Sequence, residues 1–284
     1  MVKLIYGLAK FSNQNYGFGS KHKNFNKKNF LFYISKFFNI FECADRYIGS
    51  NKYISLLKKK EIHFKIDNIP HKKTEKEILN YFLKKIQLYK LVQNISKVEV
   101  LYIHQNNLQI IQNKKILRTL FFLKKNKLVK NFGVSIYSEK ELVYVLQNKI
   151  FTYIQMPINI ADSYYFAKYK KKLKNKIIIA RSLVLQGTLL SPKINIKFKK
   201  QITNFINYLN VICYNNKISK EEIIYRYIFS LKNLNYALIG SINKTNIKKI
   251  IEYKKKGQLN KKLMNELFKI SSTKKYWSNP QRWN

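Results

Sequence analysis

Three short apolar runs stand between residues 98 and 157: Val98-Glu-Val-Leu-Tyr-Ile-His104, Leu128-Val-Lys-Asn-Phe-Gly-Val-Ser135 and Phe151-Thr-Tyr-Ile-Gln-Met-Pro157. Each is rich in β-branched and aromatic residues and has the length of a strand. The segments between them, 116–125 and 138–147, carry apolar residues at helical spacing. Strands that alternate with helices predict a parallel sheet. Polar residues stand at or near the carboxyl end of each run, where such a sheet carries its chemistry.

The same alternation extends to both sides of these runs. Further strands are predicted at 4–9, 37–43, 62–67, 176–181 and 235–240, and further helices at 29–36, 50–59, 74–83, 201–209, 219–228, 246–252 and 261–268. Eight strands in 284 residues, with no long linker and no internal repeat, predict an α/β fold, a (β/α)8 TIM barrel whose single domain spans residues 1–284. A doubly wound open sheet is the main alternative. The first turn, residues 7–11, lacks the glycine-rich pattern that such a sheet usually has.

The charge of the chain is strongly positive. It has 56 Lys and Arg against 14 Asp and Glu, a net charge of +42, and this basic composition suits a protein that binds polyanions. The lysines are spread over the whole chain, however, and they accompany abundant Asn, Ile, Tyr and Phe, as expected from an A+T-rich genome. We favour this compositional origin, and expect no specific nucleic-acid partner. The hydrophobic content of 46% excludes a disordered chain.

Two cysteines, Cys43 and Cys213, are too few for a disulfide framework and favour a reducing compartment. No apolar run is long enough to cross a bilayer or to form a signal-peptide core. We therefore expect a cytoplasmic protein without membrane insertion.

The predicted barrel brings a set of polar residues to one rim. In chain order they are Glu42 with nearby Tyr47, then Asn68, His104, Ser135, Gln155 with Asn159, Arg181 with Ser182, and Gly240 with Ser241. They include no Asp/Glu/His cluster for a metal, no Ser-His-Asp triad and no carboxylate pair for glycoside hydrolysis. Such a set can hydrogen-bond a carbonyl group and a flat ligand that carries an amide. Anion binding is predicted for the last loops, which contain Gly187, Gly240, Ser241, Asn243 and Asn246.

Motifs along nearly the whole chain resemble those of the aldo-keto reductase family, in the right order. The opening, residues 1–17, resembles the bacterial branch found among surface-polysaccharide genes. Residues 41–48, FECADRYI, stand where the family has I-D-T-A-x-x-Y-G. Further matches are LYIH (101–104), FGVSIYS (132–138), IQMPIN (154–159), ARSLVLQGTLL (180–190), IGSI (239–242) and NPQRW (279–283).

The resemblance implies an NADPH-dependent reductase of aldehydes or ketones, with NADH as the alternative cofactor and a sugar-derived carbonyl as one candidate substrate. It implies a monomer or weak oligomer that needs no metal. Tyr47 matches the family's general acid, and His104 matches the residue that orients the carbonyl. Ser135, Gln155 and Asn159 match the nicotinamide site. The pyrophosphate and adenosine end of the cofactor matches Arg181, Ser182, Gln186, Gly187, Gly240, Ser241, Asn243 and Asn246.

Two positions depart from the family's catalytic tetrad. Glu42 stands in place of the aspartate, and Asn68, in Asn68-Ile-Pro70, falls where the lysine is expected. A neutral amide cannot lower the pKa of a tyrosine as an ammonium does. Lys65 or another nearby lysine could substitute for it, although Lys65 is expected to point away from the rim by strand alternation. The sequence thus leaves two alternatives to a working reductase: an impaired homologue that binds dinucleotide as a sensor or scaffold, and a polyanion-binding protein.

Overall fold

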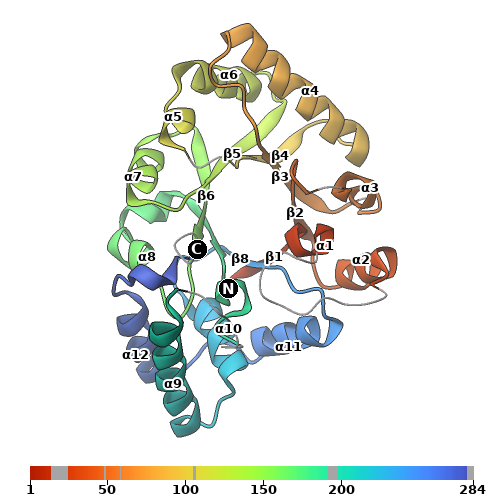
Figure 1. The fold of residues 1–284 in the computed structure, drawn as a ribbon. Coiled ribbons are helices and arrows are strands. Elements are labelled where there is room, and N and C mark those ends of the chain that lie inside the picture. Colours follow the sequence, from red (N-terminus) through yellow and green to blue (C-terminus); the bar gives the residue numbers. More distant parts are fainter. Residues whose placement is uncertain (14–24, 48, 58, 105–106, 191–196, 280–284) are drawn as a thin grey trace.

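The computed structural model describes residues 1–13, 25–47, 49–57, 59–104, 107–190 and 197–279. Eight parallel strands form a closed barrel in chain order, with β8 paired to β1 and the helices outside (Figure 1). The strands are β1 (Lys3–Gly7), β2 (Ile40–Ala44), β3 (Glu61–Ile66), β4 (Val98–Ile103), β5 (Val129–Ser135), β6 (Phe151–Pro157), β7 (Ile177–Arg181) and β8 (Tyr236–Ile239). The predicted single-domain (β/α)8 barrel is confirmed. The motif residues 14–17, 48 and 280–283 lie outside the described residues.

Twelve α-helices lie in the described part of the chain: α1 (Ala9–Ser12), α2 (Lys27–Ser35), α3 (Ser50–Ile54), α4 (Glu75–Gln93), α5 (Leu108–Ile111), α6 (Lys114–Lys125), α7 (Glu139–Gln147), α8 (Tyr164–Lys168), α9 (Lys199–Asn215), α10 (Lys220–Ser230), α11 (Lys244–Lys255) and α12 (Lys261–Ser271). Three short 3₁₀ helices are η1 (Lys172–Asn175), η2 (Leu185–Gly187) and η3 (Tyr276–Ser278). Strand β2 begins three residues later than predicted. The amides of Phe37 and Phe38 still bond to Ile34 at the end of α2, so this stretch is not extended.

Polar side chains cap many of the helices, as their sequences predict. Thr74 and Glu77 form a capping box at the start of α4, and Ser138 with Glu141 forms another at α7. Asparagines cap further helices, including α6 and α11, through Asn113 and Asn243. Part of the asparagine content is therefore used to satisfy the free amides at helix starts.

The two faces of each strand pack into different clusters. On β3, Ile62, Phe64 and Ile66 belong to the large core between the strands and the helices. A second cluster contains Ile5, Val100, Tyr102, Tyr153 and Ile179, which come from β1, β4, β6 and β7. Residues of such widely separated strands meet only inside the barrel. His63 contacts the ring of Tyr102 in this cluster, so the His63 face of β3 is the inner face.

Gly133 on β5 is required by the close packing inside the barrel. A Cβ atom there would lie 2.4 Å from the Tyr102 ring and 3.0 Å from the Cβ of Tyr153. Tyr102 is fully buried, so its ring or the backbone would have to shift to make room. We expect Gly133→Ala to lower the free energy of unfolding by about 1–3 kcal/mol, as overpacking of a core does, measured by urea unfolding. Gly240→Ala is the control, because the nearest atom to its Cβ would be 4.0 Å away. Equal stability of the two variants would contradict this packing.

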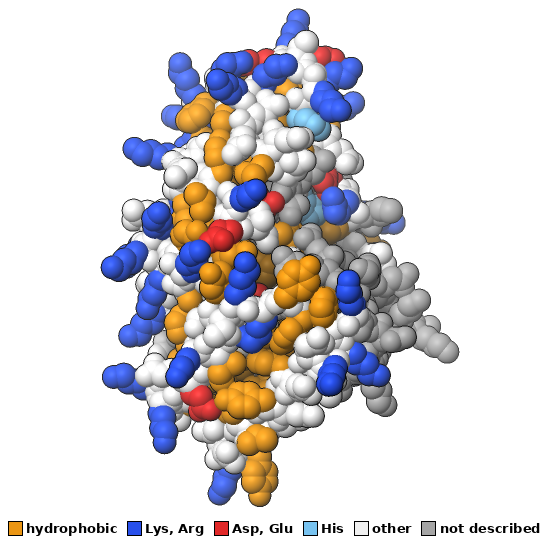
Figure 2. All heavy atoms as spheres, turned by 60° about the vertical axis from the view of Figure 1, so that its left-hand side comes forward, with side chains coloured by type: hydrophobic (Ala, Val, Ile, Leu, Met, Phe, Trp, Pro, Cys, Tyr) orange, Lys and Arg blue, Asp and Glu red, His pale blue; other side chains and the backbone are white. Residues whose placement is uncertain are grey.

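Lysine and arginine side chains are scattered over the face drawn in Figure 2 and form no single stripe there. Apolar side chains lie between them. Among the described residues no helix has the length and hydropathy required to cross a membrane.

Candidate active site

Three polar side chains from different strands meet inside the barrel. The Nζ of Lys65 on β3 lies 2.7 Å from Oε1 of Glu42 on β2, and it donates a hydrogen bond of 2.8 Å to Oε1 of Gln155 on β6. The amide nitrogen of Gln155 donates to the other carboxylate oxygen of Glu42. All three side chains are buried. The network therefore satisfies an ammonium and a carboxylate that burial would otherwise destabilise strongly.

The orientation predicted for Lys65 and the role predicted for Asn68 are wrong. Ile66 packs on the outer, helix-facing side of β3, so Lys65 points to the inside of the barrel. Asn68 is exposed and has a positive φ of 52°, in a turn beyond the strand. The ammonium beside Glu42 belongs to Lys65. Burial lowers the pKa of Lys65, while the charge and hydrogen bond of Glu42 oppose that shift.

Tyr47 and His104 lie together at the carboxyl end of this part of the barrel. The amide of Tyr47 bonds to Ala44, and Ala44 is the register partner of Lys65. His104 directly follows β4, and its amide bonds to Ile66. The two rings are 6.3 Å apart between centroids and nearly perpendicular. Both side chains are partly exposed, so a ligand at the rim can contact them while Lys65 stays buried.

Two charged residues beside His104 escaped the sequence prediction. Asp67, two residues beyond Lys65, is 2% exposed, and its Oδ2 lies 3.0 Å from Nδ1 of His104. The same oxygen accepts a hydrogen bond from Nε of Arg46, whose side chain is largely exposed. The signal in the sequence is the alternation His63, Lys65, Asp67, which places the three on one face of an extended chain.

Burial lowers the pKa of His104 to about 3, and the positive charge of Lys65 acts in the same direction. The carboxylate of Asp67 opposes both effects. His104 is therefore neutral at pH 7.

The residues predicted for the nicotinamide site lie at the ends of β5 and β6. Ser135 is the register partner of Gln155, and both are buried. Gln155 is engaged by Glu42 and Lys65. Asn159 is fully buried, and its Oδ1 accepts hydrogen bonds from two following amides. Its Nδ2 has no hydrogen-bond partner among the described residues, which leaves a buried donor at this end of the barrel.

Arg181 lies at the end of β7, where its guanidinium stacks over the ring of Tyr137, 3.7 Å from the ring centroid. It donates hydrogen bonds to Ile136 O, at 2.8 Å, and to Ser182 Oγ, at 3.4 Å. The backbone that follows has positive φ at Ser182 (58°), Leu185 (45°), Gln186 (58°) and Gly187 (101°). Non-glycine residues adopt this conformation at a cost, and such strain concentrates at ligand sites.

The loop after β8 is held by its own polar groups. Tyr6 donates a hydrogen bond to Ser241 O, and Ser241 Oγ accepts from the amide of Asn243. Asn243 in turn caps α11 through the amide of Asn246. Gly240 leaves space at the rim, because among the described residues a Cβ there would have only Gly7 O as near as 4.0 Å. Ser241, Asn243 and Asn246 therefore lie close together at the start of α11. This helix has 12 residues, and the dipole of such a helix favours an anion at its N-terminus.

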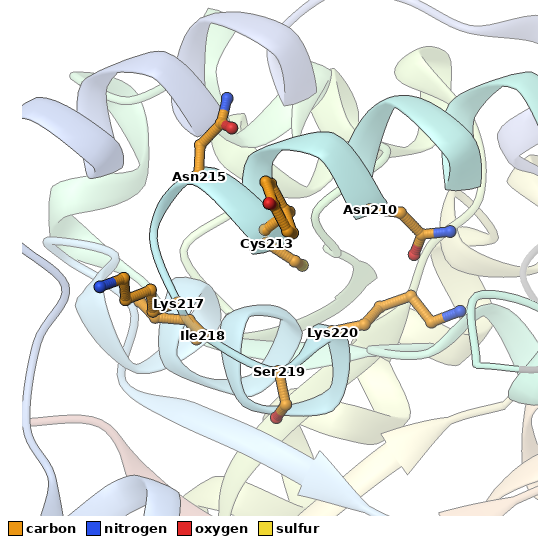
Figure 3. Close-up of a pocket in the computed structure, with 8 residues that line it drawn as sticks. Asn210, Cys213, Asn215, Lys217, Ile218, Ser219 and Lys220 are labelled. Carbon is orange, nitrogen blue, oxygen red and sulfur yellow. The ribbon is translucent and has the colours of Figure 1, made fainter.

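A surface depression lies away from this rim, between the end of α9 and the start of α10 (Figure 3). Asn210, Cys213, Lys217 and Lys220 are among its lining residues, and none belongs to the predicted site. Cys213 and Cys43 are buried and are not joined in a disulfide. The described residues contain no group of three or more His, Cys, Asp or Glu that could hold a metal ion.

Comparisons with known proteins agree with this barrel. The sequence profile of the Aldo/keto reductase family matches residues 3–272. The holo form of an aldo-keto reductase from Bacillus halodurans is similar in structure, with a TM-score of 0.75 at 11% identity, over 97% of this chain and 94% of that one. An aldose reductase from Schistosoma japonicum gives a TM-score of 0.65 at 13% identity, over 96% and 90%. No curated protein sequence matches significantly.

At these identities the structural neighbours establish the fold, whereas the family profile covers almost the whole chain. The family acts on small carbonyl compounds and generally uses nicotinamide cofactors. The protein is a member of the aldo/keto reductase family.

Proposed function

We propose that this protein is an NADPH-dependent reductase that converts an aldehyde or ketone to an alcohol. The observation that carries the proposal is the buried contact of Lys65 with Glu42 and Gln155, close enough to His104 for the charge of Lys65 to act on that ring. The alternative of an impaired homologue rested on an absent ammonium, and Lys65 supplies one. Nothing in the comparisons supports polyanion binding as the function.

The residues at the rim fit a nicotinamide cofactor. The buried Nδ2 of Asn159 needs an acceptor, such as the carboxamide oxygen of a nicotinamide, and Ser135 lies nearby on β5. Arg181 and the strained backbone of Ser182, Gln186 and Gly187 form a loop suited to a pyrophosphate, and Ser241, Asn243 and Asn246 lie at a helix start. NADPH, when bound, supplies hydride to the carbonyl carbon.

The chain's own residues then handle the developing charge on oxygen. Tyr47 donates its phenolic proton to the alkoxide, and the positive charge of Lys65 favours the phenolate left behind. Glu42 and Gln155 hold Lys65 and keep it charged in a buried place. The packed interior of the barrel excludes water from the surroundings of Lys65, Glu42 and Gln155. We further propose that the enzyme acts in the cytoplasm.

A fluorescence titration with NADPH and with NADH tests the cofactor assignment. Wild-type protein is expected to bind NADPH at micromolar concentrations and more tightly than NADH. Arg181→Met is expected to weaken NADPH binding about tenfold or more, since charge-assisted hydrogen bonds contribute about 1.5–3 kcal/mol each. Lys220→Met, in the depression of Figure 3, is the matched control and should bind normally. A wild-type protein that binds neither nucleotide would contradict the proposal.

A further inference from the structure

Asp67 has no role in the proposed reaction as described above, although it lies beside His104. It is almost fully buried at the rim, and its Oδ2 is 3.0 Å from Nδ1 of His104. Its other oxygen, Oδ1, is buried without a hydrogen-bond partner among the described residues. A buried carboxylate oxygen without a donor is costly, so this group favours any arrangement that brings an N–H toward it.

Nδ1 of His104 is likewise buried without a hydrogen-bond partner among the described residues. The distance from Nδ1 to Asp67 Oδ2 is short, but the contact does not have the geometry of a hydrogen bond. Catalytic hydrogen bonds are often poorly aligned without ligand and tighten when substrate binds. A small rotation of the imidazole ring would therefore align Nδ1 with the carboxylate of Asp67.

The partner at Nδ1 determines where a neutral imidazole carries its proton. A carboxylate paired with Arg46 accepts hydrogen bonds and has no proton to offer. The side of His104 that faces Asp67 must then carry the hydrogen. We propose that Asp67 is a positioning residue that holds His104 in the Nδ1–H tautomer, so that Nε2 serves the site as a hydrogen-bond acceptor.

This tautomer changes what His104 can recognise. A carbonyl oxygen has no hydrogen to donate to Nε2, whereas a hydroxyl does. His104 would then orient the substrate through a hydroxyl group beside the carbonyl, and proton donation to the carbonyl oxygen would fall to Tyr47 alone. The use of this tautomer in reduction rests on the proposed function, but the tautomer itself does not.

Nitrogen-15 NMR of histidine-labelled protein tests the proposal without any activity assay. The chain has four histidines, so a His104→Gln variant assigns the signal of His104. Long-range proton–nitrogen correlations distinguish the Nδ1–H tautomer from the Nε2–H tautomer. We expect Nδ1–H in the wild type at pH 7 and a shift toward Nε2–H in Asp67→Leu. The control is Glu139→Gln, because Glu139 bonds Lys168 and Tyr169 and should leave the tautomer unchanged.

An Nε2–H signal in the wild type would overturn the proposal, even if Asp67→Leu failed to fold. The same tautomer in wild type and in folded Asp67→Leu would also overturn it. If the enzyme reduces aldehydes, Asp67→Leu should lower kcat/KM about 10²-fold, as misplacement of a positioned group does, with NADPH affinity preserved. Absence of turnover in the wild type would refute the proposed function and leave the NMR result standing.

Discussion

Replacing Tyr47 with phenylalanine is expected to lower kcat for aldehyde reduction by about 10²–10⁴-fold, the usual contribution of a positioned general acid. The hydroxyl is the only proton donor of that ring, and the phenyl ring keeps the edge-to-face contact with His104. Steady-state oxidation of NADPH with a small aldehyde gives kcat, and fluorescence titration gives cofactor affinity. Affinity for NADPH should be nearly unchanged, because the loss occurs in the proton transfer.

Tyr53→Phe is the matched control for this substitution. Tyr53, in α3, is also a partly buried tyrosine. Its ring packs on Phe11 and lies near the ammonium of Lys27. Loss of the Tyr53 hydroxyl should leave kcat within a factor of about two of the wild-type value, since substitutions close to the surface usually have small effects. If Tyr47→Phe retained wild-type kcat, Tyr47 could not be the acid.

Replacing Lys65 with methionine should affect both activity and stability. Removal of the ammonium leaves Glu42 as a buried, unpaired charge, which typically lowers the free energy of unfolding by about 3–5 kcal/mol. The loss of positive charge behind Tyr47 should also reduce kcat by roughly 10²-fold or more. Urea unfolding and NADPH oxidation measure the two effects separately.

A second substitution separates the two effects of Lys65→Met. The double variant Glu42→Gln/Lys65→Met removes both charges and allows the new amide to hydrogen-bond Gln155, so most of the lost stability should return. Activity should not return, because no ammonium is present. Asn68→Lys should leave kcat near the wild-type value, since Lys65 already supplies the charge. A strong rate increase in Asn68→Lys would contradict the assignment of Lys65.

The barrel could be predicted from the sequence because its signals are local. Strand-length apolar runs such as 98–103 and 151–157 alternate with capped helices, and each can be recognised within about ten residues. The sequence places the start of β2 too early because Phe37 and Phe38 resemble strand residues, whereas they complete the last turn of α2. Apolar composition alone does not separate a buried helix end from a strand start.

The candidate site was predicted less completely, and β3 shows why. Ile62, Phe64 and Ile66 alternate as one apolar face, which leaves His63 and Lys65 on the other. Inside a barrel that other face is the functional one, so Lys65 points inward, contrary to the orientation expected from the sequence. The family's K-x-P pattern, matched at Pro70, places the lysine position at Asn68, because sequence spacing does not show which side chains the strand turns inward. The pairing of Asp67 with His104 joins different strands, and nothing local in the sequence specifies it.

Aldehyde-dependent oxidation of NADPH by the wild-type protein tests the central claim most directly, namely that Lys65, Glu42 and Tyr47 form a working acid. A panel of small aldehydes, including hydroxyaldehydes, should give turnover with NADPH, with the corresponding alcohol as product. Protein that is folded and binds NADPH, yet reduces no aldehyde or ketone of the panel, would contradict the account.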